Sequence, residues 1–129
     1  MTGHVFLRHL DSDDGELEVT ALPRGPIAIH SGGFQLILQA NEGRALVLAG
    51  MQCMHADDDA EPFHVALLAG NALEVDATRK SVDPRLWISS EAAHLSVRYG
   101  TARALFAAIS EACKWLRKHD LHAGEGGRC

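Results

Sequence analysis

The sequence has few aromatic residues, prolines and cysteines. Aromatic residues make up 5% of its 129 residues, and it contains 4 prolines and 3 cysteines. The cysteines, Cys53, Cys113 and Cys129, are odd in number and form no Cys-x-x-Cys pair. Neither a disulfide framework nor a zinc knuckle is therefore indicated, and we expect reduced thiols.

The sequence also lacks an excess of basic residues and any long apolar run. Twelve Lys and Arg stand against seventeen Asp and Glu, giving a formal net charge of -5. This balance argues against a nucleic-acid-binding protein, whose affinity comes largely from a basic surface. No apolar run approaches the length of a membrane span, and the N-terminus has no signal-peptide pattern, so we expect a cytoplasmic protein without membrane contact.

Catalytic signatures are absent as well. The sequence contains no Gly-x-Gly-x-x-Gly, P-loop, Gly-x-Ser-x-Gly or His-Glu-x-x-His motif, so we expect no enzymatic activity and no cofactor. One alternative is a small metal-dependent enzyme or metal sensor that uses Cys53, His55 and Asp57 with the acids that follow at 58 and 59. These ligands mix soft and hard types and match no known spacing, which favours a simple acidic loop.

The composition that is present fits one folded domain. Hydrophobic residues make up 47% and charged residues 22% of the chain, as in ordinary globular proteins. We predict a single α+β domain over residues 1–119, followed by a flexible Gly-rich tail over residues 120–129.

Alternating patterns dominate the N-terminal half. Residues 4–10 could form a short helix or a strand, and the acidic cluster that follows would end either. Residues 16–22, 27–30, 34–40 and 44–51 alternate or are rich in β-branched residues, with turn residues between them. This pattern predicts an antiparallel meander of three to four strands.

The segment over residues 62–69 has apolar residues with no clear polar side. We predict a short helix there, beginning at Pro62 and ending at Gly70. A helix that is apolar around most of its circumference must be buried on more than one side. A second subunit on a two-fold axis would cover the second side, and central burial within a monomer is the alternative.

The rest of the chain predicts a hairpin and a helix. Residues 72–91 have two alternating segments around a turn, with Trp87 on the face opposite to Leu86 and Ile88. Residues 92–100 are a further short strand or a packed loop. From residue 101 to 118 the apolar residues follow the helical period and form one stripe, which predicts an amphipathic C-terminal helix.

The order of these elements, with the segments LLAGNAL, RLWIS and ALFAAISEACKWLRK, resembles the class I chaperones of bacterial type III secretion, the CesT-like family. The resemblance covers roughly residues 27–118. It implies a twisted antiparallel sheet, a short dimer-axis helix and a C-terminal helix. It also implies a cytosolic homodimer that binds the N-terminal segment of a secreted effector protein and keeps it secretion-competent. A same-fold adaptor unrelated to secretion is a further alternative.

The resemblance also implies roles for particular residues. The expected dimer interface comprises Phe63, His64, Val65, Leu67, Leu68, Leu73, Val75 and Trp87. The expected effector-binding grooves comprise Phe34, Leu36, Ile37 and Val47. The segment ELEVTAL departs from the family pattern, because it has the alternation of an extra strand where the family has an N-terminal amphipathic helix.

Overall fold

The protein is an α+β domain, as the sequence predicts, and its described part contains eight strands and two helices. The computed structural model describes residues 4–11, 15–32, 34–57, 59–67, 70–80, 82–91 and 93–123. The elements in chain order are β1 (His4–Asp11), β2 (Gly15–Ala21), β3 (Ile27–Ser31), β4 (Phe34–Leu38), α1 (Ala40–Met54), β5 (Phe63–Ala66), β6 (Ala72–Thr78), β7 (Arg85–Ser89), β8 (His94–Arg98) and α2 (Tyr99–Ala123).

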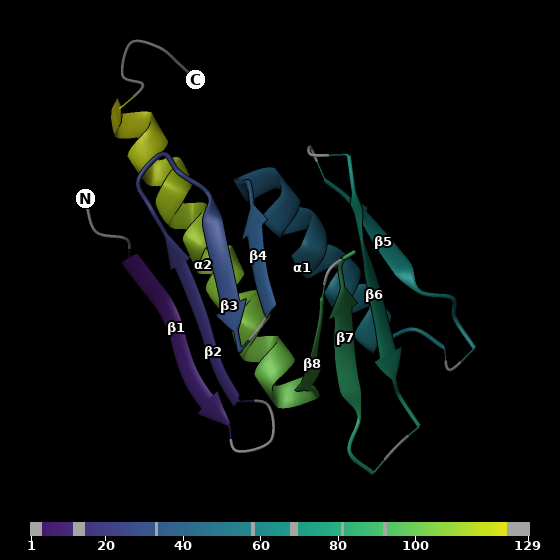
Figure 1. Ribbon diagram of the computed structural model, residues 1–129. Coiled ribbons are helices and arrows are strands. Elements are labelled where there is room, and N and C mark those ends of the chain that lie inside the picture. Colours follow the sequence, from purple (N-terminus) through teal and green to yellow (C-terminus); the bar gives the residue numbers. More distant parts are fainter. Residues whose placement is uncertain are drawn as a thin grey trace.

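The chain repeats one arrangement twice: four antiparallel strands followed by a helix (Figure 1). One sheet has the order β1-β2-β3-β4 and the other β5-β6-β7-β8, so every strand pairs with its neighbour in sequence. Short turns join such strands without a crossover, and this makes a meander the simplest arrangement. We call these the first and second sheets.

Each helix covers the sheet of the other half. α1 follows the first sheet but makes its main sheet contacts with β5 and β6, whereas α2 follows the second sheet and makes its main sheet contacts with β1 and β2. The two helices also pack against each other. The two halves are thereby held together by their helices, and neither sheet has its own helix as its main cover.

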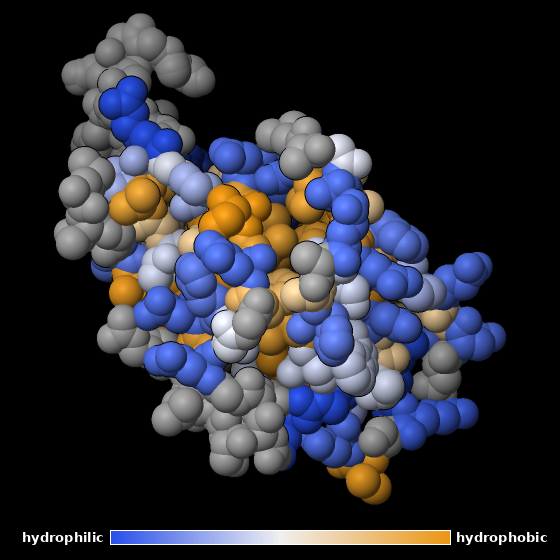
Figure 2. All heavy atoms as spheres, viewed as in Figure 1, coloured by the Kyte–Doolittle hydropathy of each residue, from blue (hydrophilic) through white to orange (hydrophobic). Residues whose placement is uncertain are grey.

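The core lies between the inner faces of the sheets and the helix pair. Alternate residues of the strands point inward, including Val19, Ile29 and Leu38 from the first sheet and Leu73 and Ile88 from the second, all at most 1% exposed. Strands with one buried face show this period of two. Figure 2 shows that apolar side chains also gather near the middle of one outer face, with hydrophilic ones around its margin.

Several predicted elements are confirmed. The strands near 16–22, 27–30 and 34–40 are β2, β3 and β4, and the predicted hairpin is β6 and β7. Residues 4–11 and 94–98, for which two conformations were open, are strands. The C-terminal helix is longer than predicted, because it continues through Ala123, past the expected start of the tail at residue 120. Residues 124–129 lie outside the described part.

The strand predicted over residues 44–51 is wrong, because this segment belongs to α1. Its buried residues follow helical spacing and include Leu46, Ala49 and Cys53, whereas Leu48, which shares the alternation with Leu46, is 60% exposed. A capping box starts the helix: the Gln39 backbone N–H donates to Glu42 Oε1 at 2.8 Å. The tertiary contact with the second sheet selects the helical period over the alternating one.

The helix predicted over residues 62–69 is also wrong, because residues 63–66 form β5, which pairs antiparallel with β6. Val65 is buried against the core, whereas His64 and Ala66 are exposed. The apolar residues of this strand are therefore divided between its two faces. The described residues of the segment do not form the apolar helix from which the two-fold axis was inferred. Leu68 and Ala69 lie outside the described residues.

Candidate functional site: an aromatic pocket at the β1 edge

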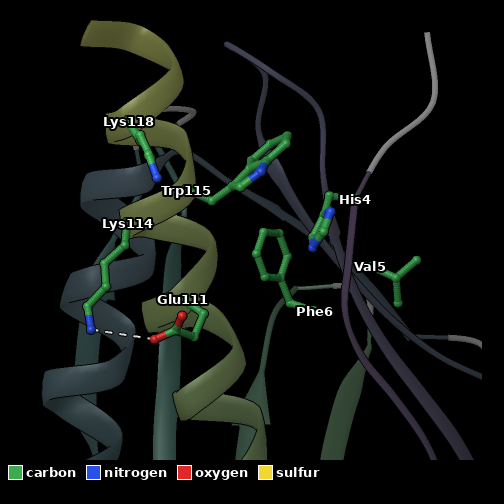
Figure 3. Close-up of a pocket in the computed structure, with 7 residues that line it drawn as sticks. All are labelled: His4, Val5, Phe6, Glu111, Lys114, Trp115 and Lys118. Atoms are coloured by element: carbon green, nitrogen blue, oxygen red, sulfur yellow. Dashed lines mark hydrogen bonds and ion pairs between the residues drawn. The ribbon is translucent and has the colours of Figure 1, made fainter. Parts of the chain in front are cut away.

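The clearest candidate site is a pocket of about 440 Å³ between β1 and α2. Its position is set by the exchange of helices, because α2 lies against the first two strands of the chain. Figure 3 shows the side chains that surround it. The lining residues are His4, Val5, Phe6, Glu111, Lys114, Trp115 and Lys118.

β1 is an edge strand with an irregularity at the pocket. Val5 pairs with Thr20 and Leu7 with Val19, so Phe6 is an additional residue that leaves the regular register. Such a bulge changes the direction of neighbouring side chains. His4 and Phe6 both face α2, with ring centroids 4.6 Å apart, while Val5 points away from Trp115 (Figure 3).

Trp115 closes the pocket from the helix. Its ring stacks on His4 at a centroid distance of 5.4 Å and meets the edge of Phe6 at 5.6 Å. Aromatic pairs at such distances stabilise each other by about 0.5–1.5 kcal/mol beyond the area that they bury. Phe6 and Trp115 are only partly buried. Part of this aromatic wall is therefore accessible to a ligand.

Charged side chains flank the aromatic wall on α2. Lys114 and Lys118 are exposed, one helical turn apart, and the Lys114 ammonium lies 3.4 Å from a carboxylate oxygen of Glu111. An exposed pair of this kind contributes little to stability. Lys114 can consequently exchange Glu111 for an anionic group of a ligand at little cost, beside an apolar surface.

The strand edge adds backbone donors and acceptors to this site. In the described part of the chain β1 pairs on one side only, with β2. The other side of an edge strand can pair with an extended segment of another chain. A segment on this edge would place alternate side chains next to His4, Phe6 and Trp115.

The four predicted effector-binding residues do not form one groove. Phe34 and Leu36 are 4% and 6% exposed and belong to the core, which contradicts their assignment to a surface groove. Ile37 points outward and lines a separate hollow of about 440 Å³ on the outer face of the first sheet. Val47 lies on α1 and borders a groove between the helices. The error arose because both faces of the strands carry apolar residues.

Some of the predicted dimer-interface residues are buried in the core of the monomer, and others lie at the surface. Val65, Leu73 and Val75 are buried in the monomer, where β5 and β6 contact α1, so they cannot form a subunit contact in this structure. His64 is exposed, and three others are partly exposed: Phe63, Leu67 and Trp87. Leu68 lies outside the described residues.

Among the described residues, the alternative metal or nucleophile site is not assembled, and Asp58 lies outside them. The Cys53 thiol is buried, with its sulfur 3.6 Å from the Val75 carbonyl oxygen, and Arg79 donates to the Cys53 carbonyl oxygen at 2.7 Å. Burial raises the pKa of this thiol, although Arg79 opposes the shift; an activated nucleophile needs the opposite. His55 is exposed, and no group of three metal-ligating side chains occurs among the described residues.

Sequence reasoning missed His4, Phe6 and Trp115 as site residues. Residues 4–10 were compatible with either a short helix or a strand, but the bulge and the position of α2 are tertiary features. The one usable signal was Trp115, a large aromatic residue between Lys114 and Lys118 on the less buried part of an amphipathic helix.

Comparison of the chain with protein-family models, with curated proteins and with solved structures finds no match. Within the part of the chain that the structure describes, neither helix combines the length and the hydrophobicity that a membrane span requires.

Proposed function

We propose that this protein is a non-enzymatic binding module that holds an extended segment of another protein. The aromatic pocket beside the β1 edge is the observation that supports this proposal. Strand addition supplies backbone hydrogen bonds of about 0.5–1.5 kcal/mol each. An apolar or aromatic side chain of the segment packs against the accessible parts of Phe6 and Trp115, and an acidic neighbour meets Lys114 or Lys118.

The resemblance to the CesT-like family gives this activity a biological context. On that resemblance we propose a cytosolic secretion chaperone whose partner is the N-terminal segment of a secreted effector. The β1 edge agrees with such a partner, because a segment kept unfolded for export has its backbone groups free for pairing. An adaptor outside secretion would use the same edge and pocket for a different protein.

We further propose that the chaperone acts as a homodimer, as the family does. With Val65, Leu73 and Val75 committed to the core, the partly exposed Trp87 and the exposed His64 remain for such a contact. They lie on the outer side of the second sheet, opposite to the face that packs on α1. A subunit contact on this side would lie away from the aromatic pocket.

Segment binding can be tested with a displayed library of random peptides, selected on the wild-type protein and then measured by calorimetry. Trp115→Ala is expected to weaken the selected peptides by at least about tenfold, equivalent to 1.4 kcal/mol. Val82→Ala is the control, because it removes an exposed apolar side chain that lies outside the pocket. Bound peptide should also slow hydrogen exchange of the β1 amides.

Two results would contradict segment binding: selection of no peptide, or selected peptides that bind Trp115→Ala as tightly as wild type. The homodimer is tested separately by light scattering across a range of protein concentrations. A monomer at every concentration would contradict the homodimer and leave segment binding standing.

A further inference from the structure

A second apolar surface lies between the two helices, away from the aromatic pocket. It is a groove of about 300 Å³. Its floor is apolar, and two exposed apolar residues of α1 are the lining residue Met51, which is 36% exposed, and Leu48, which is next to Val47 in sequence and 60% exposed. The lining residues are Val47, Met51, Arg103, Phe106, Ala107 and Ser110.

The two helices run antiparallel along this groove. Gly50 lies against the Phe106 ring, and near the other end of α1 the Cys113 sulfur is 3.4 Å from the Ala40 carbonyl oxygen. Arg103 therefore stands at the end of the groove next to Met51. Arg44 and Arg117 stand beyond the opposite end, near Cys113. Burial raises the pKa of the Cys113 thiol, and the two arginines partly oppose this rise.

Most of the charged side chains near the groove are basic. Arg44, Arg103 and Arg117 are exposed, whereas residues 43–54 of α1 and 99–110 of α2 contain no acidic residue. Among the described side chains of the helices, Glu42 is buried in the α1 cap and Glu111 lies beside Lys114. A chain with a formal net charge of -5 thus has a basic border around this apolar groove.

We propose that the α1–α2 groove binds an amphipathic helix of another protein that has acidic residues near both of its ends. A ridge of apolar side chains at helical spacing fits a groove between two helices. Arg103 and Arg117 lie ~21 Å apart along α2 at 1.5 Å per residue, and the groove itself occupies residues 103–110 of this span. The partner helix accordingly has about four turns, with carboxylates at each end to pair with these arginines.

The charges favour this partner over a second copy of the chain. A symmetric contact between two such grooves would place Arg103 of one copy against Arg44, Arg103 or Arg117 of the other, and like charges at an interface oppose association. The inference is independent of segment binding, because Trp115 and the groove residue Ser110 lie on different sides of α2, one facing β1 and the other α1.

The test uses two synthetic helical peptides of equal length and identical apolar residues at positions i, i+3, i+4 and i+7. One carries glutamates near both ends and the other lysines. With the full-length protein, calorimetry should show that the glutamate peptide binds at least about tenfold more tightly than the lysine peptide. This preference should decrease with added salt, because the charges are exposed.

Variants of the groove complete the test. Arg44→Glu combined with Arg103→Glu should reverse the preference between the peptides, and Ala107→Glu should abolish binding of the glutamate peptide. Lys80→Glu, an exposed charge change outside the groove, should leave the preference unchanged. Circular dichroism confirms that each variant is folded.

Three results would overturn the proposal. The first is equal binding of the two peptides or binding of neither. The second is full binding of the glutamate peptide to Ala107→Glu. The third is a dimer in light scattering that Ala107→Glu dissociates, since the occupant of the groove would then be a second copy of the chain.

Discussion

Replacing Gly50 by alanine is expected to destabilise the protein, because an added Cβ atom would collide with the Phe106 ring of the other helix. A Cβ atom at position 50 would lie 2.1, 2.6 and 2.9 Å from three carbon atoms of the Phe106 ring. Carbon atoms in favourable contact are about 3.5–4.0 Å apart. Phe106 is itself 2% exposed, so moving its ring also displaces other core side chains.

The magnitude follows from two opposing effects. Overpacking of a core costs about 1–3 kcal/mol, whereas alanine is more favourable than glycine within a helix by about 0.5–1 kcal/mol. The net loss for Gly50→Ala is therefore between about 0 and 2.5 kcal/mol, and the short distances to the Phe106 ring favour the upper part of this range. In a chain of this size such a loss lowers Tm by a few degrees.

Urea unfolding followed by circular dichroism measures this change as a shift in midpoint at constant m-value. Gly100→Ala is the matched control, because Gly100 also lies in a helix but no atom stands within 4 Å of its added Cβ. It should be neutral or more stable by up to about 1 kcal/mol. If Gly50→Ala is as stable as Gly100→Ala, the proposed helix contact is wrong. In a Phe106→Leu background the cost of Gly50→Ala should decrease, because the two residues are in contact.

Two further predictions concern buried polar groups. Burial raises the pKa of the Cys53 and Cys113 thiols above the ordinary value of 9.0, so above about pH 9 the unfolded state binds fewer protons than the folded state and stability should fall. A thermal-melting series from pH 8 to pH 10 should therefore show a shallower loss for the double alanine variant, and identical slopes would contradict the prediction. Glu42→Ala should lower the free energy of unfolding by about 0.5–2 kcal/mol, because it breaks the capping box. Glu42→Gln should retain most of the stability, because its side-chain amide oxygen still accepts from the Gln39 backbone N–H. Hydrogen exchange of the Gln39 backbone amide discriminates the two variants, since it should be faster in Glu42→Ala alone.

The strands could be predicted from the sequence where alternation and turn residues agree. Residues 15–21 and 27–38 meet both conditions, and the hairpin of β6 and β7 does as well. The α1 segment failed, because Leu46 and Leu48 suggested alternation, although Gln39 and Glu42 carried a capping-box signal. β5 failed for a related reason: a short apolar run fits a buried helix or a strand equally well.

The candidate sites could be predicted only in small part. Ile37 and Val47 are accessible as expected of binding residues, but they border different hollows, and Phe34 and Leu36 lie in the core. An apolar residue on a strand can face either side. Which side is buried depends on the helix that covers it, and this helix comes from the other half of the chain.

The sequence by itself determined the α+β class and the amphipathic C-terminal helix, because these depend on local periodicity and turn chemistry. Only the tertiary structure decided that each helix covers the opposite sheet, which in turn brings Trp115 against His4 and Phe6 and leaves Met51 beside Arg103. The physical reason is that local propensity is set by neighbours along the chain, whereas burial of a face depends on residues far away in sequence.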